Sequence, residues 1–112
     1  MTAKNKLVGK WRIISMSAWD KEYCDMEVPA HITIGKNLGG DFQFGLVSGQ
    51  IDGRIIKRQE EDYFEFTWDG NEECDPASGS GWMKLKDNGH ADGEIKIHLG
   101  DDSTFQAKKV RK

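Results

Sequence analysis

The chain has 112 residues, a formal net charge of −3 at neutral pH, 13 glycines and only 2 prolines. This length fits one domain over residues 1–112, with room for a single hydrophobic core. Lysine and arginine are scattered among aspartate and glutamate along most of the chain. Because neither a basic stripe nor a basic net charge is present, we expect no nucleic acid and no membrane surface as a partner.

Residues 1–6 lack the apolar run of a signal peptide, and no stretch approaches the length of a membrane span. We therefore expect a soluble, cytoplasmic protein. The two cysteines, Cys24 and Cys74, match neither a metal motif nor a disulfide framework in their spacing. In a reducing compartment we predict two free thiols, and the sequence leaves open whether they approach each other. No metal site and no cofactor is expected.

In chain order, residues 7–16 are predicted as the first strand. The apolar side chains change phase between Ile13 and Ile14, which predicts a bulge of the kind that curves a barrel strand.

A helix of about two turns is predicted next, over residues 17–26. Ser17 can serve as its N-cap, and Trp19, Tyr23 and Met26 recur at helical spacing as one apolar stripe. Over the open end of a barrel, such a stripe is either a plug that buries its aromatic rings or a lid that gates a cavity. Amphipathic helices ordinarily bury their apolar face, which favours the plug.

Short strands joined by turns account for the rest of the chain. Ser48-Gly49 is predicted as a hairpin turn, residues 58–62 as a charged loop, residues 69–80 as the longest loop, and residues 87–89 and 100–102 as tight turns. The remaining strands are predicted at residues 30–34, 41–46, 50–57, 63–68, 81–86, 91–99 and 104–110.

Eight strands with mostly short connections predict an all-β fold. We expect an eight-stranded antiparallel up-and-down barrel with one short helix after the first strand, because closing the sheet removes its exposed edges. A sandwich of two packed sheets is the alternative, since hydrophobic periodicity does not distinguish the two.

The segment Leu7-Val8-Gly9-Lys10-Trp11 carries a Gly-x-Trp pattern that resembles the start of the calycin superfamily, which includes lipocalins, fatty-acid-binding proteins and avidins. In that superfamily the tryptophan packs across the closed base of a barrel, often beneath a basic side chain of the last strand. The resemblance implies this position for Lys108, Lys109 or Arg111. The small polar residues that avidins place after the tryptophan are replaced here by Arg12 and Ile13. The resemblance therefore implies a calycin-like barrel and leaves its ligand open.

Trp11, Phe42, Phe44, Phe64 and Phe66 share the phase of the apolar residues and are predicted to lie in the core. Trp82 stands apart from them. Its neighbours in phase are Lys84 and Lys86, whereas Met83 and Leu85 occupy the other phase. Trp82 is therefore predicted on the outer face or at a barrel mouth, where it covers the surface, binds a ligand or contacts a second copy.

His98, Asp102 and Ser103 are the only catalytic residue types that lie close together in the chain. A hairpin turn explains this segment without any chemistry, so no catalytic residue is assigned.

The sequence favours a non-catalytic binding module for a small, partly apolar ligand. The alternative is an interaction protein with a filled barrel, whose outer face around Trp82 docks a partner or forms a homodimer. An enzyme using His98 and Asp102 is third. The residues predicted at the ligand-binding mouth are Trp19, Tyr23, Trp68, Trp82 and His98.

Overall fold

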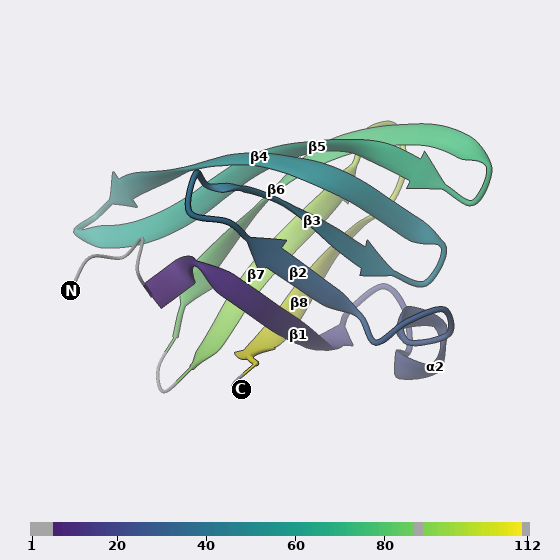
Figure 1. The fold of residues 1–112 in the computed structure, drawn as a ribbon, viewed down its shortest axis with the longest axis horizontal. Helices are drawn as coiled ribbons and strands as arrows, with labels where there is room; N and C mark the ends of the chain where they lie inside the picture. Colours follow the sequence, from purple (N-terminus) through teal and green to yellow (C-terminus); the bar gives the residue numbers. More distant parts are fainter. Residues whose placement is uncertain (1–5, 87–88, 111–112) are drawn as a thin grey trace.

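The computed structural model describes residues 6–86 and 89–110, and these residues form a closed antiparallel barrel (Figure 1). Each strand pairs with the next one in the chain, and the first strand also pairs with the last. The predicted all-β barrel is confirmed, and the alternative sandwich is excluded because the sheet closes on itself. The strands are β1 (Gly9–Met16), β2 (His31–Ile34), β3 (Gly39–Phe44), β4 (Val47–Arg58), β5 (Glu61–Glu72), β6 (Asp75–Leu85), β7 (His90–Ile97) and β8 (Asp102–Lys109), with helix α2 (Lys21–Cys24) after β1.

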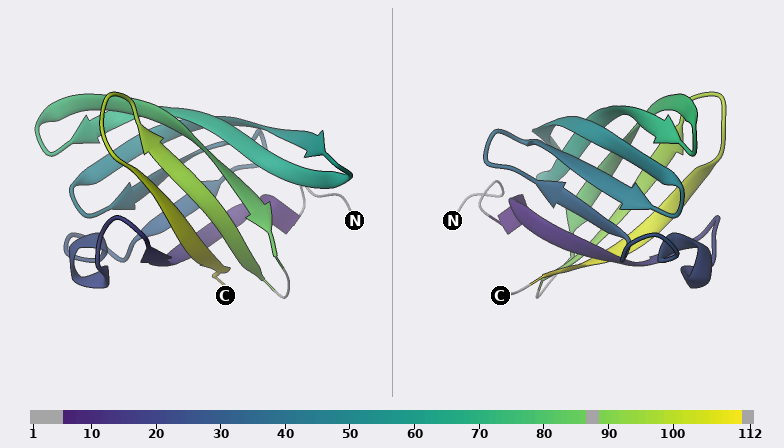
Figure 2. Two further views of the ribbon diagram at one scale, coloured as in Figure 1. Left: turned by 180° about the vertical axis from the view of Figure 1, so that it is seen from behind. Right: turned by 45° about the vertical axis from the view of Figure 1, so that its right-hand side comes forward.

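Strands β4, β5 and β6 are the longest in the described part of the chain, with 12, 12 and 11 residues. They extend one wall of the barrel beyond the others, so that the molecule measures 40 × 26 × 23 Å (Figures 1 and 2). The long wall offers a broad outer surface that shorter strands would not provide.

The helix after β1 is much shorter than predicted. It covers Lys21–Cys24 only, and Asp20 rather than Ser17 is its N-cap, because an oxygen of the Asp20 side chain accepts a hydrogen bond from the Tyr23 N–H at 2.9 Å. The Ser17 hydroxyl instead accepts a hydrogen bond from the Thr104 N–H at 3.0 Å. Bonding to β8 thus continues past the end of β1 and keeps residue 17 out of the helix.

The predicted loop at residues 69–80 is wrong. Strands β5 and β6 run through it and turn only at Glu73 and Cys74, where Glu73 has a φ of 59°. The predicted hairpin at Ser48-Gly49 is also wrong, since both residues lie inside β4 and the chain turns at Gly45 and Leu46. Of the predicted turn at residues 87–89, the first two residues lie outside the described part of the chain.

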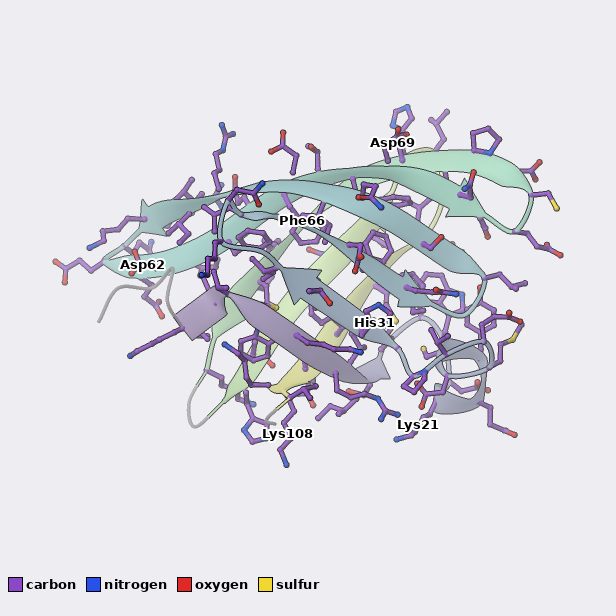
Figure 3. The ribbon with its side chains drawn as sticks, in the orientation of Figure 1. Lys21, His31, Asp62, Phe66, Asp69 and Lys108 are labelled. Atoms are coloured by element: carbon purple, nitrogen blue, oxygen red, sulfur yellow. The ribbon has the colours of Figure 1, made fainter. Side chains whose placement is uncertain are left out.

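Glycines inside the strands make room for aromatic rings in the barrel core. A side-chain carbon at Gly53 would overlap the Phe64 ring, and one at Gly81 would come within 2.5 Å of the Phe66 ring. Phe66 points to the inside of the wall, whereas Asp69 on the same strand points outward (Figure 3). The barrel interior is therefore filled by large side chains, some of which are seated over glycine backbone. The fully buried ones include Trp11, Phe44, Phe64 and Met83.

The barrel closes where β1 meets β8. The register shifts between Ile13 and Ser15, so the predicted bulge is confirmed. The Trp11 ring is fully buried, its N–H donates to the carbonyl of Leu7 at 2.9 Å, and the Lys109 ammonium lies 5.1 Å from a ring centroid. Of the three basic residues proposed for this position, Lys109 occupies it, Lys108 points outward and is exposed, and Arg111 lies outside the described residues.

Candidate functional site

Two of the predicted site residues, Trp19 and Tyr23, lie at the barrel end that α2 covers. Their ring centroids are 6.0 Å apart, and Trp19 packs on Phe44 at 5.0 Å. The Tyr23 ring lies against Gly45, where any side chain would overlap it. Both rings are half-buried in these contacts, which is the arrangement of a plug.

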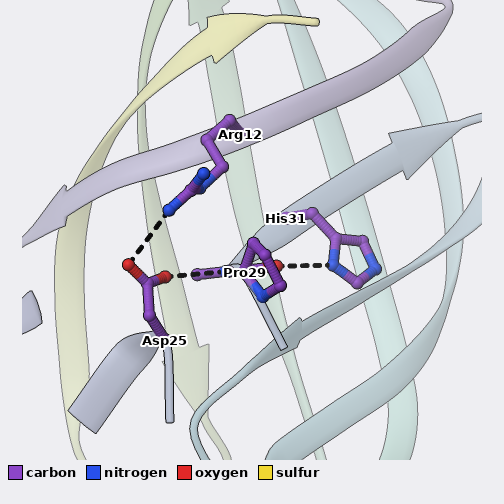
Figure 4. Close-up of polar contacts among 5 residues, drawn as sticks. Arg12, Asp25, Pro29 and His31 are labelled. Carbon is purple, nitrogen blue, oxygen red and sulfur yellow. Dashed lines mark hydrogen bonds and ion pairs between the residues drawn. The ribbon is translucent and has the colours of Figure 1, made fainter. Parts of the chain in front are cut away.

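The chain after α2 is fastened to the barrel through Asp25 (Figure 4). Its carboxylate accepts hydrogen bonds from the Ala30 N–H at 2.9 Å and from the Arg12 guanidinium at 3.0 Å. The Ala30 bond is the largest cause that lowers the pKa of Asp25, and the positive charge of Arg12 adds to it. This anchor fixes α2 over the barrel end.

Trp68 belongs to the core. It is 3% exposed, and its ring meets Phe42 edge-on with centroids 5.0 Å apart. Its N–H passes beneath Gly79 of β6 and donates to the carbonyl of Lys96 on β7 at 3.1 Å. Only an edge of this side chain reaches the outer surface.

His98 is exposed in the turn between β7 and β8, and its imidazole makes no hydrogen bond to the described residues. Ser103 is 2% exposed, and its hydroxyl contacts the Ser17 hydroxyl at 3.3 Å and accepts from the Ala18 N–H at 3.0 Å. Ser103 therefore fastens the segment after β1. Ser103 and His98 do not form a nucleophile and its base.

Trp82 lies on the outer face of the long wall, as its phase predicts, and lines a groove of about 540 Å³. Strand register builds the groove from two rows of outward side chains. The first row is Arg54, Glu65, Trp82 and Glu94, and the second is Asp52, Thr67, Ser80 and Lys96. The groove therefore crosses β4, β5, β6 and β7.

The Trp82 ring is held in place from two sides. Its N–H donates to the Glu94 carboxylate at 3.2 Å, and the Tyr63 ring meets it edge-on with centroids 5.7 Å apart. Glu65, on the opposite side of Trp82, pairs with Arg58 at 2.6 Å. These contacts make Trp82 a fixed aromatic wall.

A second cleft of about 520 Å³ continues the first, because both are lined by Thr67, Ser80 and Lys96. It extends past Ser78 to Trp68, His98 and Leu99. We call the two clefts together the outer groove. Three of the predicted site residues, Trp68, Trp82 and His98, line the outer groove, whereas Trp19 and Tyr23 line neither cleft.

Most of the polar residues in the outer groove were missed by sequence reasoning. Thr67 and Lys96 could have been placed outward from the alternation of their strands. Ser78 and Ser80 could not, because their segment has the composition of a loop.

Within the described residues, no cluster of three or more His, Cys, Asp or Glu side chains could hold a metal ion. In the same part of the chain, no helix has the length and apolar character needed to cross a membrane. No protein-family model, curated protein or solved structure matches the chain.

Proposed function

We propose that the protein is a non-catalytic binding module that takes a small, partly apolar ligand in its outer groove. The observation that carries this proposal is that the barrel interior is filled, whereas the outer face of the barrel has a groove. Inside, aromatic rings over glycine backbone occupy the space that a ligand would need. Outside, the first cleft of the groove alone has about 540 Å³ and combines an aromatic wall with polar side chains, as ligand pockets do.

A calycin-like barrel is part of this proposal. The Lys109 ammonium over Trp11 supports it, since the resemblance implied a basic residue of the last strand in this position. In this protein the barrel acts as a rigid support, and binding takes place on its wall.

The proposal is tested by screening mixtures of small aromatic and aliphatic fragments against the ¹⁵N-labelled protein by NMR. We expect shifts at the backbone amides of Thr67, Ser80 and Lys96, and at least tenfold weaker binding for Trp82→Ala. The control is Gln106→Ala, on the outer face of β8 and away from the groove, which should bind as the wild type does. Shifts confined to core amides such as that of Phe64, or no shifts at all, would overturn the proposal.

The second candidate is an interaction protein that docks another chain on the same wall. The observation that favours it is Leu99, which is 95% exposed at the end of the outer groove. Native mass spectrometry of the purified protein separates the two functions. A monomer with a small-molecule adduct supports the binding module, whereas an adduct-free dimer that Leu99→Ala dissociates supports the interaction protein.

A further inference from the structure

The floor of the outer groove presents free hydroxyl groups. Thr67 points outward from β5, and Ser78 and Ser80 point outward from the neighbouring β6. Within the described residues, none of these three hydroxyls makes a hydrogen bond to another group of the protein. Each can both donate and accept a hydrogen bond, so the floor suits a ligand that also does both.

The sides of the groove carry both signs of charge. Asp52 and Arg54 lie on the β4 side, and Glu94 and Lys96 lie on the β7 side, so each side carries one acid and one base. Glu65 between them adds a third carboxylate, whose charge the Arg58 guanidinium offsets. Asp52, Arg54 and Lys96 form no ion pair with any described residue. A carboxylate or phosphate ligand would meet carboxylates beside every cation. The balance favours a neutral ligand with many hydrogen-bonding groups over an anion or a cation.

Trp82 supplies the apolar contact. Because Glu94 and Tyr63 fix the ring, its contact surface is already ordered before a ligand arrives, which lowers the entropy lost on binding. A pyranose ring has an apolar face of C–H groups and polar hydroxyls around its edge. A flat aromatic wall beside hydroxyls and charged groups can contact both. The C–H face of the sugar stacks on the indole, and its hydroxyls reach the groups at the rim.

The groove is also elongated. From Ser78 to Trp82 the strand advances four residues, about 13 Å at the usual rise of a β-strand, and the second cleft continues to Leu99. We propose that the outer groove binds a short, neutral oligosaccharide, with one pyranose stacked on Trp82 and the next ones over Ser80 and Thr67. This inference rests on the proposed function and names the ligand class of the same site.

The test uses the full chain, an array of neutral and acidic glycans, and maltotriose, cellotriose and triacetylchitotriose in solution. Saturation-transfer NMR should show contact of the pyranose C–H protons with the protein for at least one neutral glycan. We expect at least a tenfold loss of affinity for Trp82→Ala and a severalfold loss for the double variant Thr67→Val/Ser80→Ala. Gln106→Ala is again the control, and the dispersion of the NMR spectrum establishes that each variant is folded.

The outcomes separate the two proposals. If no glycan binds but indole or a neutral tetrapeptide shifts the amides of Thr67, Ser80 and Lys96, the carbohydrate inference is wrong and the binding module stands. Binding only of acidic glycans would also overturn the inference, because it would show that the groove selects charge. If neither glycans, fragments nor peptide shift these amides, both proposals fail.

Discussion

At the residue scale, Leu99 occupies a backbone conformation that favours glycine. Its φ is 62°, and it is the third residue of a turn in which the Gly100 N–H donates to the Ile97 carbonyl at 2.9 Å. Turns with a positive φ at the third position usually have glycine there, but in this chain the glycine follows one residue later. Burial of the side chain does not offset the backbone strain at Leu99, since the side chain is 95% exposed.

We predict that Leu99→Gly stabilises the protein by about 0.5–1 kcal/mol, the relief of the left-handed strain less the chain entropy of glycine. Urea unfolding measures the change. Leu99→Ala is the matched control, because alanine keeps the strained Cβ and should leave stability nearly unchanged. A destabilised glycine variant would show that the Leu99 side chain contributes more to the fold than its exposure implies.

Asp25 links stability to pH at a single residue. Its pKa is lowered in the folded protein, chiefly by the Ala30 N–H and then by Arg12. The stabilisation is therefore complete above the unfolded pKa of about 3.9 and is lost as the pH falls through the lower folded pKa. We predict that Asp25→Asn lowers stability at pH 7 by about 1–2 kcal/mol, because it weakens hydrogen bonds to a charged acceptor.

The measurement is the free energy of unfolding of the wild type and Asp25→Asn between pH 7 and pH 2. The difference between the two proteins should shrink as the pH falls below 4. A difference that stays constant over this range would assign the effect to packing and not to the carboxylate.

At the scale of elements, the sequence predicted strand phases better than strand ends. The outward position of Trp82 and the inward positions of Phe64 and Phe66 follow from alternation alone, and all three are confirmed. The prediction of a loop at residues 69–80 was wrong because glycine is typical of turns, whereas Gly70 and Gly79 lie inside strands and face inward. Their role depends on rings and backbone from neighbouring strands, which local sequence does not reveal.

Gly79 of β6 tests this explanation. A side-chain carbon there would overlap the Lys96 carbonyl and come within 2.7 Å of the Trp68 ring nitrogen. We predict that Gly79→Ala destabilises the protein by about 2–3 kcal/mol, as overpacking in a core does. The Trp68 indole N–H resonance should also move, because its hydrogen bond to Lys96 is disturbed.

Gly100→Ala is the control for this prediction. Its nearest contact would be the Cγ2 methyl of Ile97 at 3.0 Å, whereas a side-chain carbon at Gly79 would overlap a backbone carbonyl, so Gly100→Ala should cost clearly less than Gly79→Ala. Equal costs would mean that glycine at position 79 is not needed for the packing of Trp68.

The turn between β4 and β5 is a second element whose residues do not match its geometry. Gln59 and Glu60 have φ angles of 51° and 68°, as both central residues of a type I′ turn do, and such turns favour Asn-Gly. We predict that the double variant Gln59→Asn/Glu60→Gly stabilises the protein by about 1 kcal/mol. Thermal unfolding measures the gain, and the reversed order Gln59→Gly/Glu60→Asn should give less.

At the scale of the whole molecule, charge is divided between the two ends of the barrel. The end with α2 and the β5–β6 and β7–β8 turns is acidic, and the end with the β4–β5 turn and the described chain ends is basic (Figure 1). The outer groove lies between them on the long wall, where the two signs alternate. Its mixed lining is thus a consequence of its position along the barrel. The acidic set is Asp20, Glu22, Glu27, Glu72, Glu73, Asp75, Asp101 and Asp102, and the basic set is Lys6, Lys10, Lys36, Lys57, Arg58, Lys84, Lys86 and Lys108. Lys21 at the first end and Glu60, Glu61 and Asp62 at the second have the opposite sign and offset part of each charge.

The seam where the barrel closes carries a contact between residues near the two ends of the described chain. The Lys109 ammonium donates to the carbonyls of Lys6 at 2.8 Å and Val8 at 2.6 Å while it lies over Trp11. Burial lowers the pKa of Lys109, so these bonds are made at some cost in hydration. The two hydrogen bonds still make Lys109 stabilising, because without the ammonium the carbonyls of Lys6 and Val8 lose their donor.

We predict that Lys109→Met destabilises the protein by about 1–3 kcal/mol, since methionine keeps the apolar stem but leaves the two acceptors without their donor. The matched control is Lys108→Met, one residue earlier and exposed, which should change stability by less than about 0.5 kcal/mol. Hydrogen exchange should then show reduced protection at the β1–β8 seam. The hydrogen bonds between those strands open first when the contact between Lys109 and the start of β1 is weakened. If both variants unfold alike, or if the added exchange lies in β4 and β5, Lys109 is an ordinary surface residue and closure depends on the strand ladder alone.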